Sequence, residues 1–302
     1  MINRRKFIEN SGALALGALA FGPQAAGKSV FGAVAPSMPI GLQLYTVTKN
    51  METDPEGTLK RIAEIGYKEL ESASTKLGGY YGSTAKEFAA KAKGFGLSWK
   101  AHHITGGPSR ITAGANPPAG PPSKNLRDNY QEVVNAVAEA GVSYLVCSST
   151  PIETLDEIKQ SIEVFNKTGE ACKKAGIGFA FHNHWKEFER VEGKVPYEMF
   201  LSEVSGDLMK FELDLGWATK SGTDPLELFK KHPGRFPLWH VKDLDRVTQK
   251  PVEIGAGYVD LKRIFDAAKS AGLEHSFVEQ DNAPQPLENI ANSFKNLSAL
   301  IK

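Results

Sequence analysis

Residues 155–184 read LDEIKQSIEVFNKTGEACKKAG-IGFAFHNH, which is a run of helical period, a glycine and a short apolar run. Apolar residues recur at intervals of three and four in the first part, which predicts a helix, and the β-rich second part predicts a strand. Gly176 can adopt the left-handed conformation that ends a helix and turns the chain back. The same order recurs at IG-YKEL, FG-LSWK, AG-VSYL and AG-LEHS. This alternation is typical of a parallel sheet joined by crossover helices.

From Pro39 onwards the sequence contains eight strand-like runs. They are IGLQLY (40–45), YKELES (67–72), LSWKAHH (97–103), SYLVCS (143–148), GFAFHNH (178–184), KFELDL (210–215), PLWHVK (237–242) and HSFVE (275–279). An open doubly wound sheet would be expected to carry a Gly-rich phosphate loop after its first strand, and YTVTKNMETDPEG is not such a loop. Eight units fill residues 38–302, so the sequence predicts an α/β fold with one (β/α)8 TIM barrel.

Residues 1–37 do not follow this pattern and are predicted to be a signal segment and linker. Arg4, Arg5 and Lys6 precede an apolar run that ends at Phe21, which is the layout of a secretory signal, and the run is too short to span a bilayer. NRRKFI is similar to a twin-arginine signal. We therefore expect a periplasmic or otherwise exported protein with no stable membrane anchor after processing. A frayed basic terminus and an uncleaved anchor are the alternatives.

The composition limits the kinds of molecule that this protein is expected to bind. Lysine and arginine number 36 against 35 aspartates and glutamates, so a net charge of +1 gives no field that would attract nucleic acid. We expect a small-molecule sugar or keto-sugar as partner and no nucleic acid; a homo-oligomer stays open. Cys147 and Cys172 fall in a predicted strand and helix, where we expect buried hydrophobic side chains rather than a disulfide framework or a metal site.

One connection is longer than an ordinary connector. After the third predicted strand comes ITGGPSRITAGANPPAGPPS (104–123), which is rich in glycine and proline. On a barrel this segment would lie over the catalytic face as a lid or substrate-binding loop. A disordered insertion is the alternative.

Reactive side chains gather where the predicted strands end. They are Glu71, His102, His103, His182, His184, Asp214, His240, Lys242 and Glu279. TIM-barrel active sites lie at the carboxyl ends of the strands. Strands packed on both faces should be apolar, so polar groups at their ends need partners. One such residue could be a hydrogen-bonded core residue, but so many together predict a functional site.

Four of these residues, from the last four strands, form a candidate metal site. Two imidazoles and two carboxylates, those of His182, Asp214, His240 and Glu279, can converge on one divalent ion. A mixed set of nitrogen and oxygen donors suits Mn, Co, Zn or Fe better than Ca, and Mg less well because of the imidazoles. With no cysteine ligand, water and substrate oxygens could complete the coordination, which is typical of a catalytic site.

The chain resembles the xylose-isomerase-like TIM-barrel superfamily of sugar phosphate isomerases and epimerases, which also contains inosose dehydratases and keto-sugar lyases. The resemblance runs from about Ile40 to the C-terminus and depends on GLQLYTV, FHNHWKEFE, FELDLGWATKSGTDP, GRFPLWHVKD, EIGAG and FVEQD in this order. It implies that Asp214, His240 and Glu279 bind the metal. His182 stands where most members have a glutamate, which suggests an HNH-bearing exported branch, and His184 is the competing ligand.

Residues around the ion are expected to do the chemistry. Glu279 is the first candidate general base; Lys242 is the second, with a salt bridge to Asp243 or Glu279 as its alternative role. His102 could act as an acid, although one of His102 and His103 should face outward. Substrate binding is expected from Glu71, His103, His184, Trp217 and Arg246; Trp217 replaces a histidine of several epimerases, and Arg246 could instead be a solvated surface residue.

The resemblance implies a divalent-metal-dependent sugar isomerase or epimerase that removes an α-proton next to a metal-chelated carbonyl. Phosphorylated sugars are scarce outside the cytoplasm, so an exported member would act on free or glycosidic keto-sugars. A lyase, hydratase or dehydratase acting on a 3-keto-glycoside or a keto-inositol is therefore the alternative. The second alternative is a non-catalytic sugar-binding protein. Abasic-site endonucleases share this barrel, but they would require a three-metal cluster and a basic face, which the sequence does not show.

Overall fold

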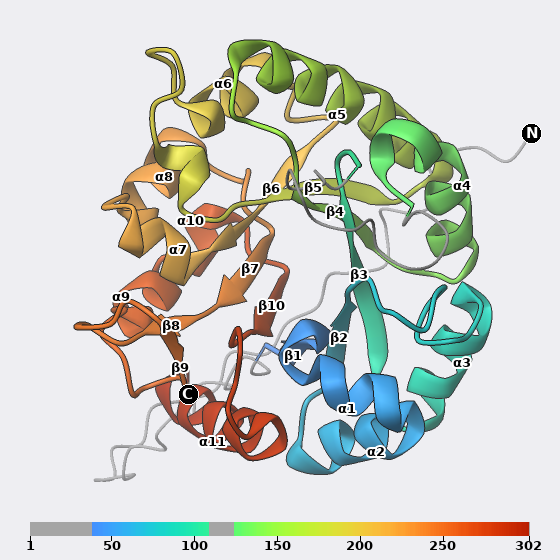
Figure 1. Cartoon of the computed structure of the whole chain (residues 1–302). Helices are drawn as coiled ribbons and strands as arrows, with labels where there is room; N and C mark the ends of the chain where they lie inside the picture. Colours follow the sequence, from blue (N-terminus) through green and yellow to red (C-terminus); the bar gives the residue numbers. More distant parts are fainter. Residues whose placement is uncertain (1–37, 109–123, 302) are drawn as a thin grey trace, which may run out of the picture. The chain divides into compact units, whose positions relative to one another are not determined.

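A closed parallel barrel forms the centre of the protein. The structure is a computed structural model that describes residues 38–108 and 124–301. Its strands close in the order β1-β10-β7-β6-β5-β4-β3-β2, with helices around them (Figure 1). The predicted TIM barrel is confirmed. The expected signal segment and residues 109–123 of the expected long loop lie outside the described residues.

All eight predicted strands are present, with small changes at their ends. They are β1 (Ile40–Gln43), β2 (Glu69–Ser72), β3 (Ser98–Thr105), β4 (Tyr144–Ser149), β5 (Gly178–His182), β6 (Lys210–Asp214), β7 (Leu238–Val241) and β10 (His275–Val278). Strand β1 ends two residues before the predicted position because Leu44–Val47 form a 3-10 helix, η1. The Gln43 side chain accepts a hydrogen bond from the backbone N–H of Tyr45 and caps this turn.

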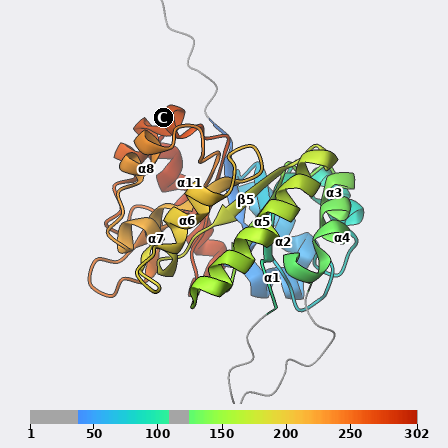
Figure 2. The ribbon, with the colours of Figure 1, turned by 90° about the horizontal axis from the view of Figure 1, so that it is seen from above.

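The helices lie outside the barrel, as α5 does relative to β5 in both views (Figures 1 and 2). Besides η1 they are α1 (Thr48–Thr53), α2 (Pro55–Ile65), α3 (Ala85–Gly94), α4 (Leu126–Glu139), α5 (Leu155–Ala175), η2 (Lys186–Phe188), α6 (Pro196–Glu203), α7 (Leu215–Lys220), α8 (Pro225–Lys231), α9 (Leu261–Asp266), α10 (Ala268–Ala271) and α11 (Pro286–Leu300). Gly176 ends α5 with a φ of 77°, as its sequence position predicts. In the described part of the chain, no helix combines the length and apolar character needed to cross a membrane.

A small apolar layer fills the inside of the barrel. Ala101, Val146, Ala180, Leu238 and Phe277 form a core cluster separate from the main one. Gly41 leaves room for the Phe277 ring, since a Cβ at this glycine would lie 2.4 Å from it. Side chains two positions apart on a strand point to the same side. Above the apolar layer, the next inward positions toward the carboxyl ends are therefore those of His103, His182, His240 and Glu279.

A short hairpin anchors the loop that contains the EIGAG sequence. Strands β8 (Asp243–Leu244) and β9 (Pro251–Val252) pair antiparallel; the sequence does not predict them, because two residues show no periodicity. The buried Asp243 carboxylate accepts hydrogen bonds from the backbone N–H groups of Gly255 (2.9 Å), Gly257 (3.0 Å) and Val259 (3.0 Å). Both buried cysteines are free thiols, as predicted.

Replacing Asp243 with asparagine is expected to destabilise the protein by about 1–3 kcal/mol, because the amide removes an acceptor from buried N–H groups. The free energy of unfolding in urea measures the loss, and hydrogen exchange at residues 255–259 should accelerate. Asp245→Asn is the matched control, since exposed Asp245 accepts similar backbone bonds within its own turn. Equal losses in the two variants would contradict the anchoring role.

Candidate metal centre

The four residues predicted to bind a metal come together at the carboxyl ends of their strands. His182, Asp214, His240 and Glu279 are all buried, and each offers one ligand atom within 4.8 Å of the others. Metal bonds to nitrogen and oxygen are about 2.0–2.2 Å long, so ligands on opposite sides of an ion lie about 4 Å apart. This spacing is compatible with one divalent ion. We call these four residues the metal-ligand group.

Two polar atoms of this group lack a hydrogen-bond partner within the described residues. Asp214 Oδ1 accepts from the Trp217 backbone N–H at 2.8 Å, whereas Oδ2 lies 2.8 Å from Lys242 Nζ and 4.0 Å from His240 Nδ1. His182 Nδ1 is buried, and its contact with Glu212 Oε2 at 3.4 Å lacks good hydrogen-bond geometry. Burial and the neighbouring His240 hold the pKa of His182 well below its usual value, so its imidazole is neutral. Burial raises the pKa of Asp214 to about 6, despite Lys242. Among the residues that the structure describes, no backbone group engages Asp214 Oδ2 or His182 Nδ1, so both atoms can serve as metal ligands.

His240 presents its two ring nitrogens to different groups. Nδ1 lies 2.9 Å from Glu279 Oε2 and 4.0 Å from Asp214 Oδ2, on the side of the metal-ligand group. Nε2 lies 2.5 Å from Glu71 Oε2 and 3.1 Å from Glu212 Oε2. A proton on Nε2 donated to Glu71 leaves the Nδ1 lone pair for a metal, which is the carboxylate–histidine arrangement common around metal sites.

Burial lowers the pKa of His240, but Glu212, Glu279 and Glu71 outweigh it and raise the pKa well above its usual value. Without an ion the ring is therefore protonated on both nitrogens. Binding of a metal at Nδ1 would displace one proton, so metal affinity should depend on pH.

Glu71 and Glu212 form a buried carboxylate pair below His240. Gln43 Nε2 donates to Glu71 Oε2 at 2.8 Å, and His103 Nε2 lies 2.6 Å from Glu212 Oε2. Burial and Glu212 raise the pKa of Glu71 to about 7. Burial alone would raise the pKa of Glu212, but His240 and His103 hold it well below its usual value. As the pH falls, Glu71 therefore takes up a proton before Glu212 does.

Around the Glu71–Glu212 pair, a region that we call the lower level, a second group of residues could hold an ion. It consists of His103, His182, Glu212 and His240. The distance of 2.6 Å between His103 Nε2 and Glu212 Oε2 is that of a short hydrogen bond, and Glu212 Oε2 also lies 3.1 Å from His240 Nε2. The hydrogen bonds within the lower level make it a support for His240, and the metal-ligand group is the better candidate site.

Glu71→Gln is expected to weaken divalent-metal binding by about 10–100-fold, the usual cost of losing an outer partner of a histidine ligand. Competition with a chromophoric chelator measures the affinity. Glu69→Gln provides the control: Glu69 lies two residues earlier on β2 and pairs with His275 Nδ1 at 2.8 Å. Unchanged affinity in Glu71→Gln would show that Glu71 does not orient His240.

Lys242 lies among carboxylates next to the metal-ligand group. Its Nζ is 2.8 Å from Asp214 Oδ2, 2.8 Å from Glu279 Oε2 and 2.7 Å from Asp281 Oδ2. Burial lowers its pKa, but these three carboxylates outweigh burial and raise the pKa well above its usual value, so the group is an ammonium. The ammonium also lies 4.6 Å from the centre of the Trp217 ring, which makes Trp217 a wall of the site. Asp243, one of the two salt-bridge partners considered from the sequence, anchors the EIGAG loop.

Two predicted site residues lie apart from this group. His102 Nδ1 is 2.7 Å from Ser72 Oγ, and its ring packs against Tyr80 and Trp99, because neighbouring residues on a strand point to opposite sides. Burial and His103 lower the pKa of His102 to about 3, so it is neutral. Arg246 is exposed on the β8–β9 turn, with its guanidinium 5.0 Å from the centre of the Tyr258 ring. The structure brings neither residue to the metal-ligand group.

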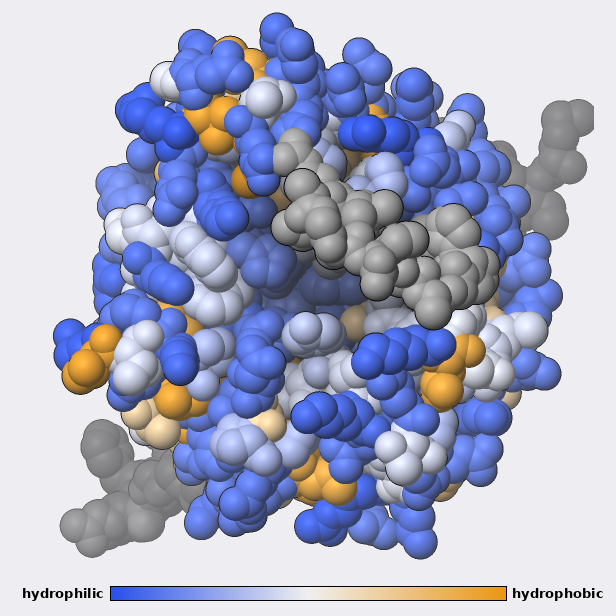
Figure 3. All heavy atoms as spheres, viewed as in Figure 1, coloured by the Kyte–Doolittle hydropathy of each residue, from blue (hydrophilic) through white to orange (hydrophobic). Residues whose placement is uncertain are grey.

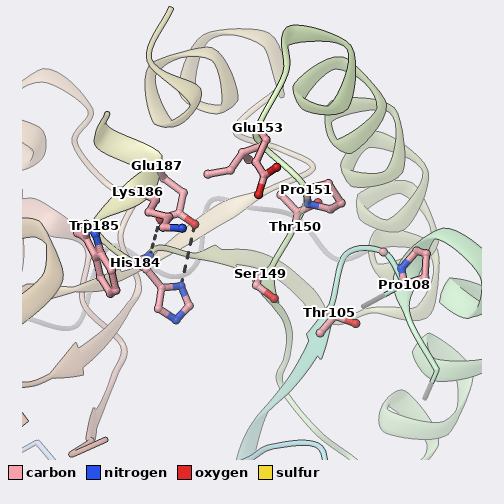
Figure 4. A pocket seen from close by; sticks show the side chains of 12 residues that line it. Thr105, Pro108, Ser149, Thr150, Pro151, Glu153, His184, Trp185, Lys186 and Glu187 are labelled. Carbon is pink, nitrogen blue, oxygen red and sulfur yellow. Dashed lines mark hydrogen bonds and ion pairs between the residues drawn. The ribbon is translucent and has the colours of Figure 1, made fainter. Parts of the chain in front are cut away.

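A cavity of about 330 Å³ lies at the carboxyl end of the barrel, and none of the four residues of the metal-ligand group lines it. Its walls include the end of β4 and the segment after β5, with His184, Trp185 and Glu187 (Figure 4). The His184 ring is 5.1 Å from that of His182, and the Trp185 ring is 4.9 Å from that of Trp217. The view along the barrel shows a hollowed, mostly hydrophilic centre (Figure 3). The cavity therefore approaches the metal-ligand group through His184, whose ring is next to that of His182.

Three residues of the site are not predicted from the sequence, namely Gln43, Glu212 and Asp281. Glu212 precedes Asp214 by two positions, so the period of a strand could have placed it on the same inward face. Gln43 is the last residue of β1, and its polar side chain in an apolar run was a usable signal. Asp281 follows β10, and no periodicity applies there.

The closed barrel and the buried donor set define the class of protein, a TIM barrel with a candidate metal centre, and comparison with known proteins gives the family. The family model described as "Xylose isomerase-like TIM barrel" matches residues 59–299, so this chain belongs to that family. A solved sugar phosphate isomerase/epimerase from Parabacteroides distasonis ATCC 8503 is 28% identical, with a TM-score of 0.74, over 92% of this chain and 100% of that chain. The family resemblance expected from the sequence is confirmed.

Two other relatives differ from each other in activity. An inosose dehydratase from Geobacillus thermodenitrificans (strain NG80-2) is 26% identical over 165 residues, which are 48% of this chain and 53% of the relative. The match thus spans about half the length of that relative. A solved D-psicose 3-epimerase from Clostridium cellulolyticum H10, in complex with D-tagatose, is 14% identical with a TM-score of 0.64, over 87% of this chain and 98% of that chain. This second likeness is one of fold.

Proposed function

We propose that this chain is a divalent-metal-dependent enzyme that acts on a sugar or keto-sugar, as an isomerase or epimerase. The observation that carries this proposal is the metal-ligand group, in which four buried nitrogen and oxygen donors meet at the catalytic end of the barrel. When bound, a divalent ion such as Mn, Co, Zn, Fe or Mg would polarise a chelated carbonyl and make the neighbouring proton acidic.

The chain's own residues supply the proton transfers in this proposal. Glu279 is the general base that takes the α-proton, because its carboxylate belongs to the metal-ligand group and would lie next to a substrate chelated there. The charged Lys242 donates a hydrogen bond to a substrate oxygen and stabilises negative charge that develops there. Trp217 and His184 form the wall against which the sugar ring lies. Protonation of the same carbon on its opposite face gives an epimer, and protonation of the neighbouring carbon gives an isomer.

A keto-sugar lyase or dehydratase is the second candidate, and the partial match to an inosose dehydratase favours it. The same proton abstraction followed by loss of a β-leaving group would give this outcome. A 3-keto-glycoside or a keto-inositol would be the substrate, in keeping with the export that we propose from the twin-arginine-like residues 1–37. Cell fractionation tests the export independently of the reaction.

Purified protein loaded with Mn²⁺, incubated in deuterated water with free ketoses and with 3-keto-glucosides, separates the candidates. Solvent deuterium in the sugar without loss of a leaving group supports an isomerase or epimerase. Release of the leaving group supports a lyase. If no substrate exchanges or reacts although metal is bound, the enzyme proposal fails and a sugar-binding protein becomes the better description.

A further inference from the structure

The Lys242 ammonium lies on oxygens that a metal in the proposed site would need. Asp214 Oδ1 accepts a backbone hydrogen bond from Trp217, so Oδ2 is the oxygen left for a cation, and Lys242 Nζ lies 2.8 Å from it. Nζ is also 2.8 Å from Glu279 Oε2. The side chain of Lys242 is buried, and its stem packs against Gly216, where a Cβ would lie 2.9 Å from Lys242 Cγ. Only the far end of the side chain is therefore free to shift.

The third partner of Lys242, Asp281, lies outside the metal-ligand group. Asp281 Oδ2 is 2.7 Å from Nζ, and this side chain is 22% exposed, in contrast with the buried Asp214 and Glu279. Three carboxylates around one ammonium leave an excess of negative charge next to the metal-ligand group. A divalent ion would offset this excess, provided that the ammonium stays on Asp281 and gives up the other two carboxylates.

We propose that Lys242 is an internal cation that holds the carboxylates of Asp214 and Glu279 in the metal-free protein and withdraws to Asp281 when a metal binds. This inference rests on the proposed metal-dependent function. Lys242 stabilises the metal-free site, because buried carboxylates without a positive partner are strongly destabilising. It also lowers metal affinity, because the ion must displace an ammonium from two of its ligands. Asp281 assists the exchange by retaining the displaced ammonium.

The test is Mn²⁺ affinity, measured by electron paramagnetic resonance of free Mn²⁺, together with the melting temperature with and without Mn²⁺. Lys242→Met is expected to bind Mn²⁺ roughly tenfold or more tightly than the natural chain, given the size of coupling between close charge pairs. Its metal-free form should melt at a lower temperature, and added Mn²⁺ should raise its melting temperature more. Lys220→Met is the matched control, since the Lys220 ammonium lies over Trp185 and Trp217 rings.

Asp281→Asn provides a second, independent variant. In the otherwise natural chain, this substitution should weaken Mn²⁺ binding. In a chain that also carries Lys242→Met, it should lower Mn²⁺ affinity less, because Asp281 acts partly by retaining the lysine that this chain lacks. If Lys242→Met does not fold in either condition, Asp281→Asn alone decides, and unchanged Mn²⁺ affinity in that variant overturns the proposal.

The outcomes separate this proposal from the proposed function. If the natural chain and Lys242→Met bind Mn²⁺ equally well, or the variant binds it more weakly, the lysine is no competitor and the metal site stands. If only Lys242→Met binds Mn²⁺, the lysine competes, but the natural protein does not use a metal. If neither chain binds Mn²⁺, both the metal-dependent function and the competition are wrong.

Discussion

Asp214→Asn is expected to lower affinity for Mn²⁺ by more than about 100-fold, because even outer partners of metal ligands contribute about 10–100-fold. Asparagine retains an oxygen for the Trp217 N–H, which Asp214 Oδ1 now accepts at 2.8 Å. Its NH₂ group would replace Oδ2, and an amide nitrogen has no lone pair to give to an ion. Loss of Mn²⁺ binding would therefore result from the lost metal ligand Oδ2 and not from a lost helix cap.

Asp224→Asn is the matched control for this experiment. Asp224 also caps a helix, α8, where it accepts a hydrogen bond from the Leu226 backbone N–H at 3.0 Å. Both variants are titrated with Mn²⁺ in competition with a chelator, and circular dichroism confirms that they are folded. Equal Mn²⁺ affinity in Asp214→Asn and the natural chain would remove Asp214 from the metal-ligand group.

Glu279→Gln is expected to lower turnover by about 10²–10⁴-fold at saturating metal, which is the usual contribution of a positioned general base. The amide cannot accept the α-proton, and exchange of this proton with deuterated water should fall by the same factor. Because Glu279 is also a proposed ligand, Mn²⁺ affinity should fall too. Turnover is therefore compared only at Mn²⁺ concentrations that saturate both forms.

Glu274→Gln is the control for Glu279→Gln. Glu274 precedes β10 and accepts a hydrogen bond from the Tyr144 hydroxyl at 2.9 Å, away from the metal-ligand group. This control should retain both turnover and deuterium exchange. Deuterium exchange that survives in saturated Glu279→Gln would assign the base to another residue.

The sequence predicted the barrel because most strands are short and largely apolar, and several strands are preceded by a glycine that ends a helix. Gly176 between α5 and β5 is the clearest case, and it has the left-handed conformation that the pattern requires. Strand ends were less well predicted. Leu44 and Tyr45 are residue types that are common in strands, so the prediction extended β1 through them. The hydrogen bond from the Tyr45 N–H to the Gln43 side chain instead turns the chain into η1. The β8–β9 hairpin depends on the distant contacts of Asp243, which local patterns do not contain.

The candidate ligands could be predicted because charged and imidazole groups seldom occur at the ends of buried barrel strands unless they bind or react with something there. Their roles depend on the phase of each strand, which the sequence leaves ambiguous. His102 and His103 are neighbours, and only the structure shows that His103 faces Glu212 inside the barrel. Glu212 lies within its strand rather than at its end, so the rule that active-site residues lie at strand ends does not predict it.

The most direct test of the central claim is X-ray diffraction from crystals grown with Mn²⁺, recorded at the manganese absorption edge. We predict one anomalous peak bonded to His182, Asp214, His240 and Glu279, at distances of about 2.0–2.2 Å. No peak in the barrel, or a peak bonded to His103 and Glu212 instead, would contradict the proposed metal centre.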